Sequence, residues 1–188
     1  REYGVLTPGI VRPCEDGGYE IVAGHRRKHG SELAGLSDMP CIVREMDDDT
    51  ATILMVDSNI QREDILPSER AQAYKMKIEA LKRQGARSDL TSPQVAAKFR
   101  ADDEVAKAAG VSGDTVRRFV RLTELQPELQ QMVDEKKIAM TPAVELSYLK
   151  PEEQQMLLTA IDSEQATPSL SQAQRMKKLS QAGKLNDD

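Results

Sequence analysis

Three closely spaced arginines, Arg117, Arg118 and Arg121, end a stretch whose apolar pattern is that of a helix-turn-helix. Guanidinium groups on the outer side of a helix can donate hydrogen bonds to phosphates and to guanine edges in the major groove. The stretch runs over residues 102–121. The positions that must pack where its two helices cross are apolar: Val105, Ala106, Ala109, Val111, Val116 and Phe119. We predict that this unit binds DNA and that Arg117 or Arg118 contacts guanine.

The turn between the two predicted helices carries residues suited to it. Gly110 can adopt the positive φ of a tight turn, and the hydroxyl of Ser112 can cap the second helix. An ordinary helical hairpin with a glycine turn is the alternative, but it gives no reason for the arginines. The predicted DNA contacts are Ser112, Gly113, Asp114, Thr115, Arg117, Arg118 and Arg121. The sequence leaves room for further base contacts outside this helix, around Lys136, Lys137 and Thr141.

A second group of residues has the composition of a polyphosphate site. A predicted strand, residues 19–23, runs into Gly24, and a helix then begins with His25, Arg26 and Arg27. The unpaired N–H groups and positive dipole end of a helix N-terminus attract anions. Cations at that end are mildly unfavourable without an anion, which favours a ligand over a merely solvated basic helix start. We therefore predict phosphate binding at Gly24, His25, Arg26 and Arg27.

A third polar phrase, residues 56–65, lies where a predicted helix should simply end. Asn59, Gln61 and Arg62 could face the same pocket as the phosphate-binding residues. On the residues alone, ordinary chemistry at the end of a helix explains them better.

The elements that must position these groups begin with an α+β region. Residues 9–13 and 19–23 are predicted strands, joined into a hairpin by an Asp-Gly-Gly turn. A helix from Gly24 to about Gly35 follows, then a strand over 40–46 with its CIV segment buried. Carboxylates at 47–49 open another helix, where they suit the positive dipole end. Its apolar face is expected to use Ala51, Leu54, Met55 and Ile60.

From Pro67 onward the sequence predicts only helices. A long amphipathic helix covers 67–84 and ends at Gln84-Gly85, and another helix starts at Thr91-Ser92-Pro93. After the helix-turn-helix, prolines mark four more helices, at 127–136, 142–149, 151–162 and 169–182. The predicted domains are therefore residues 1–66, which are α+β, and residues 67–188, which are all-α.

Composition limits the classes of function. The chain has 188 residues, 39% hydrophobic and 30% charged, as a soluble globular protein does. Its net charge is −5, yet residues 61–123 hold 13 basic and 9 acidic side chains, a local field suited to DNA. The absence of tryptophan argues against a base-stacking platform. Cys14 and Cys41, expected to be buried thiols, give no disulfide or metal spacing. With no membrane span or signal peptide in the sequence, we expect a cytoplasmic location.

The order of these motifs resembles the ParB family of chromosome and plasmid partition proteins. It runs GVLTPGIVRP, YEIVAGHRR, PCIVREMDD, SNIQRED, a P-x-E-x-A-x-A-Y motif from Pro67 to Tyr74, the helix-turn-helix, and LQPELQQMVDEKKIAMTPAVELSYLKPEEQQ. The resemblance covers nearly the whole chain. It implies a sulfiredoxin-like N-terminal domain that binds CTP with Mg²⁺. It also implies an all-α helix-turn-helix domain that binds a palindromic centromere-like DNA site.

The family's two nucleotide boxes can be carried onto this chain residue by residue. Gly24, Arg26 and Arg27 match a Gly-Glu-Arg-Arg box for the triphosphate, with His25 in place of the glutamate. Residues 58–62 match a Glu-Asn-x-Gln-Arg box. There the resemblance implies Asn59 as a ligand on the Mg²⁺ side, and Gln61 and Arg62 beside the nucleotide. Ser58 removes a carboxylate that Mg²⁺ would prefer, so we expect weakened metal binding and at most slow CTP hydrolysis.

Further expectations come from the resemblance alone. It implies a nucleoid-associated homodimer moved by a ParA-type ATPase, with a front strand before Arg1 and a dimerisation domain after Asp188. A transcription regulator of a plasmid or mobile element, without a working nucleotide switch, stays open as the alternative. A sulfiredoxin-type enzyme is not expected, because Gly24 stands where that family has its nucleophilic cysteine. A nuclease is not expected either, because the consecutive carboxylates at 47–49 point in different directions on a helix.

Overall fold

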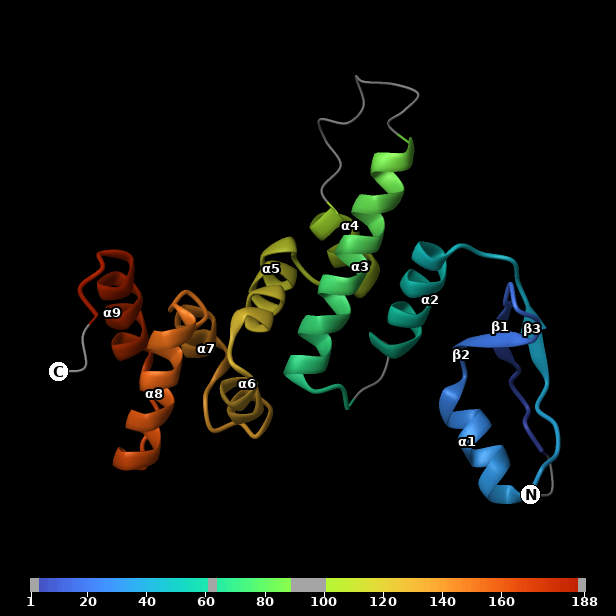
Figure 1. The fold of residues 1–188 in the computed structure, drawn as a ribbon, viewed down its shortest axis with the longest axis horizontal. Coiled ribbons are helices and arrows are strands. Elements are labelled where there is room, and N and C mark those ends of the chain that lie inside the picture. Colours follow the sequence, from blue (N-terminus) through green and yellow to red (C-terminus); the bar gives the residue numbers. More distant parts are fainter. Residues whose placement is uncertain (1–3, 61–63, 89–100, 186–188) are drawn as a thin grey trace. The chain divides into compact units, whose positions relative to one another are not determined.

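The computed structural model describes residues 4–60, 64–88 and 101–185, excluding the side chains of 86–88 (Figure 1). The described residues form two compact units. One contains residues 4–60 and 79–88, and the other contains residues 64–78 and 101–185. A boundary after residue 66 would place one whole long helix in the second domain, whereas the residues of that helix from Glu79 onward group with the first unit.

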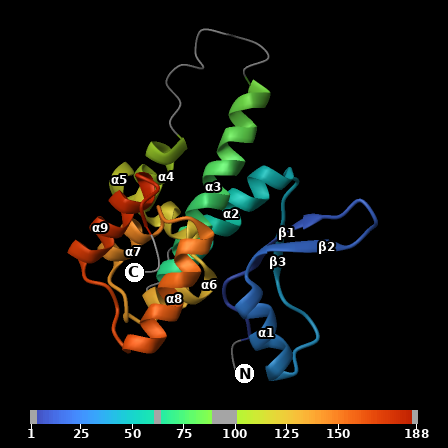
Figure 2. The ribbon, with the colours of Figure 1, turned by 60° about the vertical axis from the view of Figure 1, so that its left-hand side comes forward.

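The first unit is built on a three-stranded sheet. Its strands are β1 (Gly9–Pro13), β2 (Tyr19–Ala23) and β3 (Cys41–Val43), in the spatial order β2-β1-β3. The predicted hairpin is confirmed: β1 and β2 pair antiparallel, while β3 pairs parallel to β1 (Figure 2). Val11, Val22 and Ala23 are the buried apolar residues of the sheet.

Two helices of this unit begin where the sequence predicts, and the first also ends there. Helix α1 (His25–Ala34) starts after Gly24 and stops at Gly35. Helix α2 (Asp48–Ile60) has acidic residues in its first turn, and the backbone N–H of Thr50 donates to Asp47 Oδ1 at 2.8 Å. The expected apolar face is only partly right, because the buried positions of α2 are Asp49, Ala51 and Val56. Leu54, Met55 and Ile60 are half-buried.

The prediction of a buried third strand is wrong for the described residues. β3 is only three residues long and lies at the edge of the sheet, and all three residues are exposed. Ile42 and Val43 expose 44% and 51% of their surface. The predicted burial of the two thiols is also wrong, since Cys41 is exposed and Cys14 is half-buried. The two edge strands thus differ, because Val22 and Ala23 of β2 are buried whereas the apolar run of β3 is exposed.

Helix α3 (Pro67–Ser88) is longer than predicted. Gln84-Gly85 does not end it, because one glycine costs a helix only about 1 kcal/mol and neighbouring contacts outweigh this. Arg83 Nε donates to the buried Asp49 Oδ1 at 2.7 Å, and Gln84 Nε2 donates to Thr50 Oγ1 at 3.0 Å. These contacts attach the last turns of α3 to α2.

The second unit is all-helical, as predicted. Its elements are the first part of α3, α4 (Ala101–Ala109), α5 (Gly113–Arg121), the short 3-10 helix η3 (Leu122–Glu124), α6 (Pro127–Asp134), α7 (Met140–Leu146), α8 (Pro151–Glu164) and α9 (Leu170–Gln181). Prolines open α6 and α8, and Ser169 caps α9. One apolar core joins α3 and the elements from α5 to α9, and Leu122, Leu129 and Leu146 are fully buried in it. The predicted helix start at Thr91-Ser92-Pro93 lies outside the described residues.

A buried glutamine links three segments of this unit. Gln154 of α8 donates from Nε2 to the carbonyl oxygens of Glu124 and Leu149, both at 3.1 Å. Its Oε1 accepts from the backbone N–H of Gln126 at 2.7 Å. The side chain is 2% exposed, so it satisfies backbone groups that turn toward the core between η3 and α6 and before α8.

Within the described ranges, no helix has the length and apolar character needed to cross a membrane.

Candidate nucleic-acid interface and nucleotide site

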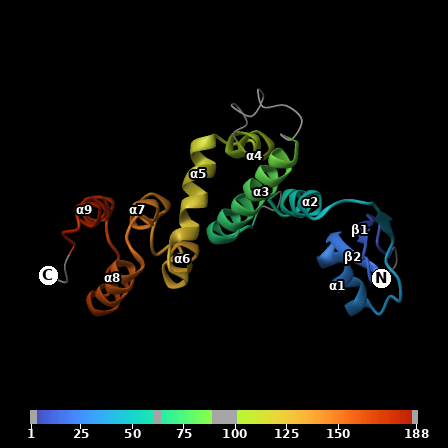
Figure 3. The same ribbon diagram turned by 45° about the horizontal axis from the view of Figure 1, so that its top comes forward.

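Helices α4 and α5 form the predicted helix-turn-helix (Figure 3). Val105, Ala106 and Val116 are buried, as the packing pattern predicts. Gly110 has φ 67° in the turn, and the Ser112 hydroxyl accepts from the backbone N–H of Thr115 at 3.1 Å. These predictions from spacing are confirmed.

Three positions of the predicted packing pattern are less buried than expected, and one of them, Ala109, is half-buried. Val111 is 37% exposed, because it lies in the turn before the α5 cap, so its predicted burial is wrong. Phe119 is half-buried. Its ring lies edge-on to that of Tyr74 in α3, with 5.8 Å between centroids, and Arg70 lies 5.6 Å from the Phe119 centroid. α5 is therefore supported by α3 as well as by α4.

Arg118 is the most available of the three arginines. Its side chain is exposed, and Nη2 donates to Thr141 Oγ1 at 2.8 Å. This contact brings the start of α7, which the sequence analysis singled out at Thr141, beside the middle of α5. Lys136 and Lys137 are also exposed; Lys137 Nζ forms an ion pair with Glu135 at 2.7 Å.

Arg117 is held by carboxylates. Its Nη2 donates to Asp114 Oδ1 at 2.7 Å, its Nη1 donates to Asp102 Oδ2, and Asp103 Oδ1 lies 4.0 Å from the same nitrogen. Hydrogen bonds to Asp114 and Asp102 raise the pKa of Arg117, so it stays charged. The side chain thus joins the start of α4 to the start of α5.

Arg121 does not lie on the outer side of α5, contrary to the sequence expectation. It is half-buried, and it donates from Nε to Ser147 Oγ at 3.1 Å and from Nη2 to the Ser147 carbonyl. Its guanidinium also stacks 4.1 Å from the Tyr148 centroid, with Lys177 Nζ 3.8 Å from that centroid. The end of α7 lies against the last turn of α5, so Arg121 points there.

The predicted phosphate site has the geometry of an anion cradle. Gly24 has φ 118°, which other residues rarely adopt, and a Cβ there would lie 3.1 Å from Gly9 Cα. α1 has no acidic residue in its first turn and no side-chain cap, so its N-terminal N–H groups face no carboxylate there. A cavity of about 200 Å³ lies beside them. Its lining residues are Ala23, Gly24, His25, Arg26, Arg27 and Ser58.

The two arginines of this cavity differ in their surroundings. Arg26 is exposed, whereas Arg27 is half-buried. Arg27 Nη1 donates to the carbonyl oxygens of Thr7, at 3.0 Å, and Pro8. Arg27 therefore attaches the segment before β1 to α1 as well as lining the cavity, a contact that the sequence analysis missed because nothing in a local pattern marks those carbonyls.

The metal part of the prediction has less support. Ser58, not Asn59, lines the cavity, and the Ser58 hydroxyl donates to the Met55 carbonyl at 2.8 Å. Asn59 is half-buried near the end of α2, and Gln61 and Arg62 lie outside the described residues. No group of three or more metal-ligating His, Cys, Asp or Glu side chains occurs in the described part of the chain. The cavity residues thus fit an anion better than they fit Mg²⁺, which prefers carboxylates.

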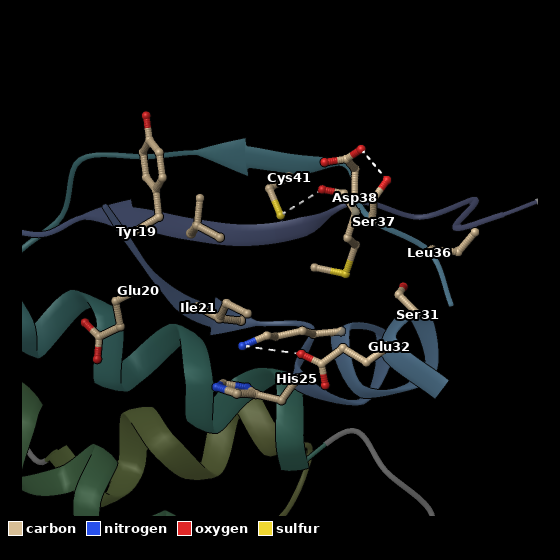
Figure 4. A pocket seen from close by; sticks show the side chains of 13 residues that line it. Tyr19, Glu20, Ile21, His25, Ser31, Glu32, Leu36, Ser37, Asp38 and Cys41 are labelled. Carbon is tan, nitrogen blue, oxygen red and sulfur yellow. Dashed lines mark hydrogen bonds and ion pairs between the residues drawn. The ribbon is translucent and has the colours of Figure 1, made fainter. Parts of the chain in front are cut away.

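A second, larger hollow of about 550 Å³ lies between the sheet and α1 (Figure 4). The strands contribute Val11, Ile21 and the charged Glu20 to its lining, and on α1 Lys28 lies 3.8 Å from Glu32. His25 lines both hollows, so the two share the first residue of α1.

Comparison with known sequences gives matches over both units. The ParB N-terminal domain matches residues 1–60, and the ParB HTH domain matches residues 92–182. The chain belongs to the ParB family. The predicted fold class, an α+β ParB-type domain followed by a helix-turn-helix domain, is confirmed by these matches and by the elements described above.

Named relatives are similar over most of this chain. The chromosome-partitioning protein Spo0J of Thermus thermophilus is 35% identical over 81% of this chain and 50% of its own length. A probable chromosome-partitioning protein ParB of Vibrio cholerae is 32% identical over 87% of the chain and 50% of its own length. A nucleoid occlusion protein of Geobacillus thermodenitrificans is 31% identical over 84% and 50%. The chain therefore spans about half the length of these ParB-family relatives.

A solved structure shares the fold. It is the crystal structure of C-terminally truncated ParB from Caulobacter crescentus, complexed to the centromeric parS site. The match has a TM-score of 0.57 and 26% identity, and it covers 92% of this chain and 82% of that one.

Proposed function

We propose that this chain binds a specific, palindromic, centromere-like DNA site in chromosome or plasmid segregation, with α5 as the recognition helix. The observation that carries the proposal is the α4–α5 helix-turn-helix with Arg118 exposed on α5, in a chain similar to a ParB crystallised on parS. Helix-turn-helix proteins place the second helix in the major groove, with its N-terminal residues at base edges. Ser112, Gly113, Asp114 and Thr115 occupy that end of α5.

The three arginines then have different roles. Arg118 is the candidate guanine reader, because an exposed guanidinium can donate two hydrogen bonds to O6 and N7. Arg117 and Arg121 support the orientation of α5, since the first is paired to Asp102 and the second is bound to Ser147. The palindromic site implies a homodimer, and the family implies a ParA-type ATPase as the partner that moves the complex.

The same proposal includes a nucleotide switch. CTP would bind with its phosphates at the N-terminus of α1, where Gly24 admits the anion and Arg26 and Arg27 supply charge. Mg²⁺ would accompany it on the side of Asn59. The support for the triphosphate is the cavity and its two arginines, and the support for CTP and Mg²⁺ is the family resemblance.

Titration of DNA by the protein tests the first part of the proposal. The wild type should bind a parS-like palindrome far more tightly than a scrambled duplex. Arg118→Ala should lower specific binding about tenfold or more, the equivalent of a lost bidentate guanine contact. Lys178→Ala, at an exposed lysine of α9, is the matched loss of one positive charge. Equal losses in the two variants would mean that the interface lies elsewhere.

Calorimetric titration with CTP, ATP, GTP and UTP in the presence of Mg²⁺ and DNA tests the second part. Selective binding of CTP supports the switch. Binding of none of the four supports the alternative, a DNA-binding regulator without a working nucleotide site. That alternative is favoured by His25 and Ser58, which stand in the cavity lining where the family boxes have glutamates.

A further inference from the structure

The front of α5 carries an exposed carboxylate. Asp114 is the second residue of the helix, and its side chain is 85% exposed. On a helix that faces DNA, a carboxylate is repelled by the phosphates, because both groups are negatively charged. A carboxylate at the N-terminal end of a helix stabilises the helix dipole. This effect does not explain why Arg117 also binds Asp114.

Asp114 is held in place by a chain of ion pairs. Arg117 donates to Asp114 Oδ1 at 2.7 Å through one terminal nitrogen and to Asp102 Oδ2 through the other. The two terminal nitrogens of Arg117 are therefore turned toward carboxylates, and the bidentate contact to guanine that they would otherwise form requires breaking both pairs. In Asp114, by contrast, Arg117 binds Oδ1, and the second carboxylate oxygen, on an exposed side chain, can accept a hydrogen bond from a base.

The residue before Asp114 permits this arrangement. A Cβ on Gly113 would lie 2.5 Å from Asp103 Oδ1 and 3.2 Å from Arg117 Nη1. Gly113 thus leaves space for the carboxylates of α4 to approach Arg117 across the start of α5. The network is fixed from both helices, so the orientation of Asp114 is set before DNA arrives.

We infer that Asp114 reads a cytosine, by accepting a hydrogen bond from its N4 amino group, and that Arg117 is the positioning residue for this contact. The inference rests on the proposed role of α5 as recognition helix. An ionised carboxylate only accepts hydrogen bonds. In the major groove guanine offers acceptors, thymine offers an acceptor and a methyl group, and adenine places its acceptor N7 beside its amino group. Cytosine presents a donor without an adjacent acceptor on its own edge, so it suits a lone carboxylate.

Base preference separates this role from stabilisation of the helix. The full chain should be used to select binding sites from a random duplex library, followed by titration of every single-base variant of the selected site. The wild type should prefer cytosine at one position of each half-site by about tenfold. Asp114→Asn keeps the shape of the side chain and adds a donor, and an asparagine pairs with N6 and N7 of adenine. The preference at that position should therefore change from cytosine to adenine, while the other positions keep theirs.

Two further variants complete the experiment. Glu104→Gln removes an exposed negative charge from α4 and should raise affinity for all sequences alike, without changing any base preference. Arg117→Ala should reduce the cytosine preference at the same position and leave the other positions unchanged, an effect that a merely structural role would not give.

The outcomes separate two failures. A wild type that selects a site, with an Asp114→Asn variant that selects the same bases at every position, overturns the reading of Asp114. A wild type that selects no sequence overturns the proposed function, and the inference with it.

Discussion

The buried amide of Gln154 offers the sharpest test of how the second unit is held together. Replacing Gln154 by leucine keeps a side chain of similar size and removes three hydrogen bonds to backbone groups. One of these, to the Leu149 carbonyl, is buried, and the other two, to Glu124 and Gln126, are partly buried. The leucine offers no partner, so the buried Leu149 carbonyl loses its hydrogen bond without regaining water, and the two partly buried groups regain it only in part.

The expected cost follows from those burials. An unsatisfied buried backbone group costs about 1–3 kcal/mol, and partly buried groups cost less because water reaches them. We expect Gln154→Leu to lower the free energy of unfolding of the second unit by about 3 kcal/mol in total. For a unit of this size that corresponds to a fall in Tm of about 10–15 °C.

Thermal unfolding followed by circular dichroism at 222 nm, with urea unfolding as the second measurement, would give both quantities. Gln155→Leu is the matched control, since it makes the same chemical change at the next residue of α8, where the side chain is exposed. It should change stability by about 0.5 kcal/mol or less. If Gln154→Leu costs no more than Gln155→Leu, the three hydrogen bonds do not hold η3, α6 and α8 together.

Three further changes test the nucleotide cavity and the helix-turn-helix. Arg26→Ala should weaken CTP binding about tenfold in calorimetry, because it removes a charged donor from the cavity. Lys28→Ala, which changes a residue outside that cavity, should leave CTP binding unchanged. Equal effects of the two substitutions would contradict the proposed site. Ser58→Glu restores a carboxylate to the lining and should raise Mg²⁺-dependent phosphate release from CTP, so an unchanged rate would count against Ser58 as the cause of slow hydrolysis. Burial raises the pKa of Asp102, but the hydrogen bond from Arg117, the backbone hydrogen bonds of Asp102 and Asp103 and the charge of Arg117 together outweigh it, so the net pKa lies below 3.8. The ion pair of Asp102 and Arg117 therefore stabilises the fold above about pH 4, and this stabilisation is lost as pH falls through the lowered pKa. Arg117→Ala should accordingly flatten the acid limb of a profile of Tm against pH. An unaltered limb would show that the ion pair contributes nothing to stability.

Much of the fold follows from local sequence patterns. The hairpin of β1 and β2, the start of α1 after Gly24, the cap at Ser112 and the prolines that open α6 and α8 were all predicted correctly. Each depends on residues within about four positions of one another, which propensity and capping rules describe. The errors fall where distant segments decide the result. β3 is exposed despite its apolar run, and α3 continues past Gly85 because of its contacts with α2.

The nucleotide site was predictable in composition and only partly in geometry. Gly24, His25, Arg26 and Arg27 line one cavity, as their adjacency predicts. The role of Arg27 in holding the carbonyls of Thr7 and Pro8, 20 and 19 residues away, has no local signal.

The sequence by itself determined that a helix-turn-helix exists and where its turn lies, because apolar spacing and turn chemistry depend on neighbouring residues. It could not determine which of the three similar arginines is held by other groups of the chain. Only the tertiary structure decided that, by placing Asp102 against Arg117, 15 residues away, and Ser147 against Arg121, 26 residues away. A guanidinium donates to whichever acceptor the packed chain places within reach, and such acceptors are supplied by the fold and not by the local sequence.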